Sequence, residues 1–113
     1  MTVLIVGRPP PGLRIKARVL ERVTREALEG AEIVVFTGDD FPADAQTVAA
    51  AGRLLIAPRA EPAYGFQPGV DHLAHSSPEE LSELLEMVTQ HPHVFEVIAA
   101  MGRLTAHARS ASA

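Results

Sequence analysis

The sequence predicts an α/β domain, a three-layer sandwich built around a small, mostly parallel sheet of four strands. Three observations carry this prediction. Short apolar runs rich in β-branched residues recur along the chain, helical patterns separate them, and Gly or Pro closes most segments. Strands that alternate with helices are typical of parallel sheets covered on both faces. The whole chain, residues 1–113, therefore forms a single domain, with residues 110–113 expected to be frayed.

The first half of the chain predicts strand, helix and strand in turn. Residues 2–7 form a β-branched apolar run that a glycine ends, and the connector 8–12 contains three prolines, which exclude a helix. Residues 13–29 place apolar side chains at helical spacing, with Arg and Glu interleaved on the other face and a glycine as the stop. Residues 31–37 repeat the first pattern and predict a second buried strand.

The second half continues this alternation with a loop inserted. Residues 42–51 predict a short Ala-rich helix, and residues 53–57 predict a third strand that a proline stops. The segment 59–69 contains two glycines and two prolines, so we expect a loop long enough to have a function. Residues 70–75 predict a short edge strand.

Two helices close the predicted fold. The run Ser77–Glu80 combines a serine N-cap, a proline at the first helical position and a glutamate that completes a capping box. The sequence His91–His93, with its central proline, breaks this helix. A last helix is expected over residues 93–108.

Composition limits the classes of function. Of the 113 residues, 47% are hydrophobic and only 4% aromatic, and the formal net charge is −4. The absence of Cys excludes disulfides, thiolate metal sites and Cys nucleophiles. Net acidity offers no electrostatic footprint for nucleic acid, and no apolar run is long enough for a membrane span. The first residues lack the basic stretch of a signal peptide. We therefore expect a cytoplasmic protein with no cofactor, no nucleic-acid partner and no membrane span.

The candidate site follows from the sheet. Ligands of parallel α/β sheets bind beyond the carboxyl ends of the strands. In this sequence four segments follow such ends: Gly7–Arg8, 37–40, 57–59 and 75–77.

Residues 39–52 resemble a segment of the GT-B glycosyltransferases, which reads acidic-Gly-Phe-Gly, several apolar residues, a second acidic residue and a closing glycine. The segment 53–57, the loop at Gly69, the helix that starts at Ser77 and the run 98–103 are similar to later segments of that family, in the same order. This resemblance implies a Rossmann-like fold, like the C-terminal, nucleotide-sugar-binding half of those enzymes.

The resemblance also implies a site. In the family a pair of carboxylates holds the donor sugar and the ribose, and the helix N-terminus between them faces the diphosphate. Asp39 takes the first acidic position, whereas Thr47 takes the second, and a hydroxyl cannot grip two ribose hydroxyls as a carboxylate does. The candidate ligand-binding residues are Gly7, Arg8, Asp39, Asp40, Phe41, Asp44, Thr47 and Gly69, with no catalytic residue and no metal ligand.

Each candidate also has a simpler interpretation. Asp39, Asp40 and Asp44 could hold sugar hydroxyls or Mg²⁺, but Asp is typical of turns and helix caps, which is the favoured interpretation. The segment 7–12 could cradle phosphate or form a polyproline contact surface. Its three prolines lack N–H groups, so a rigid turn is favoured.

The histidines have no metal-site spacing. His72 and His75 are neighbours, as are His91 and His93, but neither pair is at helical i, i+4 spacing and no third ligand is evident. We therefore expect four surface histidines.

Two functions stay open. Compared with the family, the chain lacks one βα unit and the whole N-terminal domain, so it resembles a truncated and degenerate half of such an enzyme. The first hypothesis is a stand-alone glycosyltransferase-like module, non-catalytic by itself, that acts through a protein partner or as a homodimer. The alternative is a nucleotide-sugar-binding subunit of a two-chain glycosyltransferase. A receiver-like signalling domain fits worst, because no acidic pair follows the first strand.

Overall fold

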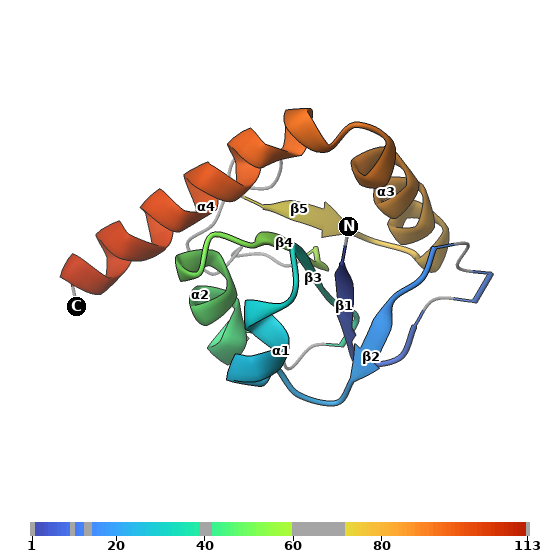
Figure 1. Cartoon of the computed structure of the whole chain (residues 1–113), viewed down its shortest axis with the longest axis horizontal. Coiled ribbons are helices and arrows are strands. Elements are labelled where there is room, and N and C mark those ends of the chain that lie inside the picture. Colours follow the sequence, from blue (N-terminus) through green and yellow to red (C-terminus); the bar gives the residue numbers. More distant parts are fainter. Residues whose placement is uncertain (1, 10, 13–14, 39–41, 60–71, 113) are drawn as a thin grey trace.

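The computed structural model describes residues 2–9, 11–12, 15–38, 42–59 and 72–112. Its five strands are β1 (Val3–Val6), β2 (Arg18–Leu20), β3 (Ile33–Phe36), β4 (Leu54–Pro58) and β5 (Leu73–His75). Its four helices are α1 (Arg25–Glu29), α2 (Pro42–Ala50), α3 (Pro78–Gln90) and α4 (Pro92–Ser112) (Figure 1).

The five strands form one sheet in the order β2-β1-β3-β4-β5, and all four neighbouring pairs are parallel. The α/β class and the parallel sheet are thereby confirmed, with five strands where we expected four. The chain leaves β1 toward β2 on one side and then returns to β3 on the other side. Because of this reversal, the carboxyl ends of the neighbouring strands β1 and β3 form a topological switch point, the place where doubly wound sheets bind ligands.

Helices cover both faces of the sheet, so the three-layer arrangement is also confirmed. Alternate residues of each strand face opposite sides, which divides the core in two. One half packs the α1 and α2 side chains against strand residues such as Leu4 and Val34. The other half packs α3 and the start of α4 against residues such as Ile5 and Val35.

The predicted helix over residues 13–29 is wrong. Residues Arg18–Leu20 instead form the edge strand β2 beside β1, and of the described residues in this range only Arg25–Glu29 are helical. Thr24 marks the true helix start, because its hydroxyl accepts a hydrogen bond from the Ala27 N–H at 3.1 Å. The spacing of the apolar residues resembled that of a helix because the segment contributes side chains to both halves of the core. Ile15 and Ala17 pack in one half, and Leu20 and Val23 pack in the other.

The predicted start of α3 is confirmed. The Ser77 hydroxyl accepts a hydrogen bond from the Glu80 N–H, and the Glu80 carboxylate accepts one from the Ser76 N–H, both at 3.1 Å. The first bond satisfies an N–H group that a helix start leaves without an intrahelical partner. In the predicted capping box the Glu80 carboxylate would reach the N–H of Ser77, whereas in the structure it accepts from the preceding residue, Ser76.

The last helix, α4, is longer than expected and ends at Ser112; fraying of residues 110–113 stays a prediction. Gln46 of α2 donates from Nε2 to the Ala106 carbonyl at 2.6 Å, and Ala49 and Ala106 are fully buried between the two helices. Small side chains here allow α2 and α4 to approach closely. No helix in the described part of the chain is both long and apolar enough to cross a membrane.

Candidate functional site

The carboxyl ends of β1, β2 and β3 are joined by a set of backbone hydrogen bonds. The Gly7 N–H donates to the Leu20 carbonyl at 2.9 Å, and the Thr37 N–H donates to the Val6 carbonyl at 3.2 Å. Gly7 has a φ of +112°, and a Cβ at this position would collide with the Thr37 hydroxyl. Only glycine therefore allows β1 and β3 to end side by side in this way.

A cavity of about 600 Å³ opens at this edge, at the switch point. This volume lies within the range of small-molecule sites, roughly 300–1,000 Å³. Its described lining residues follow or end the first three strands or begin α2; they are Val6, Gly7, Glu21, Arg22, Val23, Phe36, Gly38 and Asp44. The site thus lies where the strand order predicts it.

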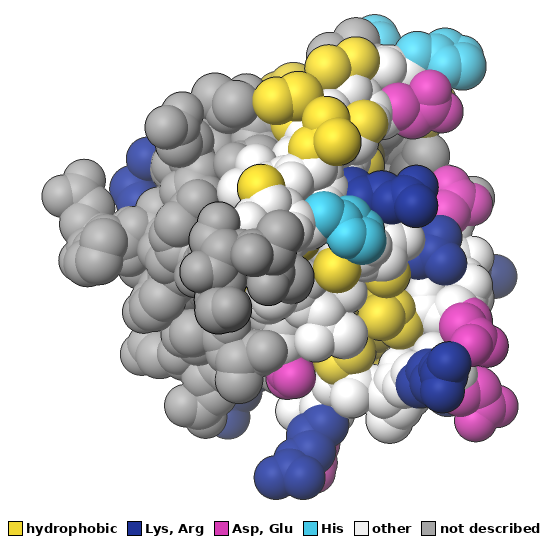
Figure 2. Space-filling model, turned by 90° about the vertical axis from the view of Figure 1, so that its left-hand side faces the viewer, with side chains coloured by type: hydrophobic (Ala, Val, Ile, Leu, Met, Phe, Trp, Pro, Cys, Tyr) yellow, Lys and Arg dark blue, Asp and Glu magenta, His cyan; other side chains and the backbone are white. Residues whose placement is uncertain are grey.

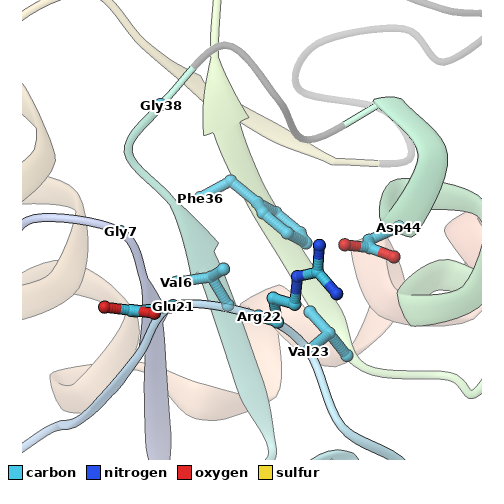
Figure 3. Close-up of a pocket in the computed structure, with 8 residues that line it drawn as sticks. All are labelled: Val6, Gly7, Glu21, Arg22, Val23, Phe36, Gly38 and Asp44. Atoms are coloured by element: carbon cyan, nitrogen blue, oxygen red, sulfur yellow. The ribbon is translucent and has the colours of Figure 1, made fainter.

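Two opposite charges converge on the cavity. Figure 3 shows the guanidinium of Arg22 and the carboxylate of Asp44 extending toward each other from opposite walls, with the Phe36 ring beside them. Asp44 lies in the first turn of α2, where the helix dipole favours a negative charge. Within the described part of the chain, no ion pair is found for Arg22. Its fork of N–H donors can therefore receive an anionic group of a ligand.

Glu21 adds a second carboxylate to the lining. It directly precedes Arg22 in the bend that follows β2, and Figure 3 shows the two side chains pointing to different sides. The described lining therefore carries two acidic groups and one basic group. Carboxylates accept hydrogen bonds from ligand hydroxyls, while the arginine suits phosphate or carboxylate.

His75 fixes the end of β3 beside the cavity. Its imidazole is buried, and Nε2 lies 2.8 Å from the Phe36 carbonyl oxygen, so this nitrogen carries the proton and donates. His72 is buried as well, so the expectation of surface histidines is wrong for these two. They lie at β5, which packs against strand β4 and helix α3. His91 and His93 are exposed, as predicted.

The sequence-predicted site residues are only partly brought together. Gly7 and Asp44 line the cavity. Arg8 and Thr47 are exposed and are not among its described lining residues. The remaining candidates lie outside the described residues: Asp39, Asp40, Phe41 and Gly69.

Sequence reasoning missed Glu21, Arg22 and Val23. They follow the carboxyl end of β2, so the rule that found the other candidates would have found them. The signal was lost because residues 18–20 were assigned to a helix.

Metal ligands do not gather in the described structure: no group of three or more His, Asp or Glu residues there could hold a metal ion. Comparison of the chain with protein-family models, curated proteins and solved structures finds no match.

Proposed function

We propose that this chain is a glycosyltransferase-like module that binds a nucleotide sugar at the switch-point cavity and is non-catalytic by itself. One observation carries the proposal: an arginine with no ion pair to any described residue and two carboxylates line a cavity of ligand size at the carboxyl edge of a parallel sheet. The ordered motifs similar to those of GT-B glycosyltransferases support the same class of ligand.

The chemistry of the lining matches the parts of a nucleotide sugar. Arg22 would hold the diphosphate through charge-assisted hydrogen bonds. Asp44 and Glu21 would accept hydrogen bonds from the sugar or ribose hydroxyls. Val23, half-buried at the same cavity, offers an apolar contact.

The non-catalytic part of the proposal rests on Thr47. The family to which the sequence is similar has a carboxylate here, and Thr47 is exposed and does not line the cavity with the other described residues. Asp44, one helical turn earlier, is the α2 carboxylate that lines it. A site with this arrangement would hold a donor sugar without the carboxylate that accepts hydrogen bonds from both ribose hydroxyls in the family.

Isothermal calorimetry with UDP-glucose, GDP-mannose and ADP-glucose tests the proposal. We expect heat of binding from at least one of them, with no release of nucleoside diphosphate. Arg22→Ala should weaken binding about 10- to 100-fold, the effect of losing a charge-assisted hydrogen bond. Arg18→Ala is the matched control, because Arg18 is an exposed arginine of β2 outside the described lining. No heat from any of the three, or equal losses from both variants, would refute the proposal.

A further inference from the structure

An apolar stripe runs along the outer face of α4. Val97 is 65% exposed, Met101 38% and Leu104 64%, and their spacing of four and then three residues puts them on one side of the helix. Ala100 and Ala108 are also exposed on this side. Figure 2 shows hydrophobic side chains along this helix on the face toward the viewer.

This stripe is not used by the fold of the monomer. The opposite side of α4 makes the internal contacts, through Phe95 against the sheet and Ala106 against α2. Contiguous exposed apolar patches mark interaction surfaces, whereas apolar residues exposed singly are normal.

The charges beside the stripe indicate which partner covers it. Glu96 and Arg103 are both exposed and lie seven residues apart, two turns along the same side of the helix. The Glu96 carboxylate also lies 3.7 Å from Nδ1 of His93, an exposed contact that leaves most of its surface open to a partner. The midpoint between Glu96 and Arg103 falls next to Ala100. The midpoint between Val97 and Leu104 of the stripe also falls next to Ala100. The arrangement is therefore self-complementary about this point.

We propose that α4 pairs antiparallel with α4 of a second copy of this chain, about a two-fold axis near Ala100. Val97 then faces Leu104 of the second copy, and Glu96 faces its Arg103. A parallel pairing would instead place like charges together. A two-fold axis uses the same patch on both copies, which is the commonest geometry of homodimers.

The dimer leaves the ligand cavity accessible. The inner side of α4 borders a groove at the amino ends of β3 and β4; Phe95 lines it, and Glu96 lies at its border with the outer face. The cavity lies at the opposite, carboxyl end of the strands. Self-association therefore does not depend on ligand binding, and either proposal can fail alone.

Sedimentation equilibrium across the micromolar range tests the interface. The unmodified chain should form dimers, and Met101→Glu should raise the dimer dissociation constant at least about tenfold. Met87→Glu on α3 is the matched control, since Met87 is 47% exposed and lies off the stripe. It should leave the dissociation constant unchanged. A strictly monomeric chain, or equal effects of the two substitutions, would overturn the proposal.

A charge exchange tests the two-fold pairing itself. Glu96→Arg and Arg103→Glu should each weaken the dimer, because each places like charges face to face across the axis. The double variant should restore the affinity of the unmodified chain, with circular dichroism confirming that all three variants are folded. If the double variant is as weak as the single ones, the antiparallel pairing is wrong.

Discussion

The imidazole Nε2 of His75 donates to the Phe36 carbonyl, 2.8 Å away, across the intervening strand β4. The Leu54 N–H donates to the Glu32 carbonyl, so every second residue from Leu54 on turns its backbone groups toward β3. Pro58 is one of these residues and has no N–H. The imidazole therefore supplies a donor where the ladder between β3 and β4 lacks one, and it steadies the strand end that borders the cavity.

Removal of this donor should destabilise the fold. We expect His75→Ala to lower the free energy of unfolding by about 1–3 kcal/mol, because a buried carbonyl loses a hydrogen bond. Pro58→Ala restores a backbone N–H at the same carbonyl, so His75→Ala should cost less in that background. Urea denaturation of the four proteins gives the coupling energy. Strictly additive effects would show that His75 and Pro58 do not serve the same carbonyl.

The left-handed backbone at Gly7 should resist any side chain. Gly7→Ala combines a φ of +112° with a clash against the Thr37 hydroxyl, whereas Gly12→Ala meets no atom within 4 Å at a φ of +75°. We expect Gly7→Ala to cost at least about 1 kcal/mol more than Gly12→Ala, measured by thermal unfolding. Equal costs would mean that β1 and β3 do not approach as closely as described.

The start of α1 can be tested by the sign of the stability change on Thr24→Ala, which differs between a helix that begins at Arg25 and one that spans residues 13–29. If α1 begins at Arg25, Thr24→Ala removes the N-cap and should cost about 1 kcal/mol. If residues 13–29 were one continuous helix, the same substitution would stabilise it, since Ala has the higher helix propensity. Thr24→Ser, which keeps the capping hydroxyl, is the control and should be nearly neutral. Chemical denaturation distinguishes the two signs.

These residues show how far the sequence could predict the fold. The buried strands and the cap at Ser77 were predictable, because β-branched runs and capping residues are local signals. Strand β2 was not, because two of its three residues are exposed and only Leu20 packs against the core. An edge strand of this kind leaves little hydrophobic pattern, so the helical spacing around it dominated.

The candidate site was predictable in place but not in composition. The carboxyl-end rule identified Gly7, the family resemblance identified the start of α2, and the cavity lies between them. Arg22 was missed together with β2. The motif placed Thr47 at a position that binds ligand in the similar family. In the structure Thr47 lies one turn of α2 beyond Asp44 and is exposed.

The central claim is that a nucleotide sugar binds at the switch point between β1 and β3. Amide NMR of the chain titrated with UDP-glucose, GDP-mannose and ADP-glucose tests it most directly. We predict that at least one of the three shifts the backbone amides of Gly7, Gly38 and Asp44, while that of Gly52, at the amino end of β4, stays unchanged. Shifts confined to Gly52 and its surroundings, or no shift with any of the three, would contradict the account.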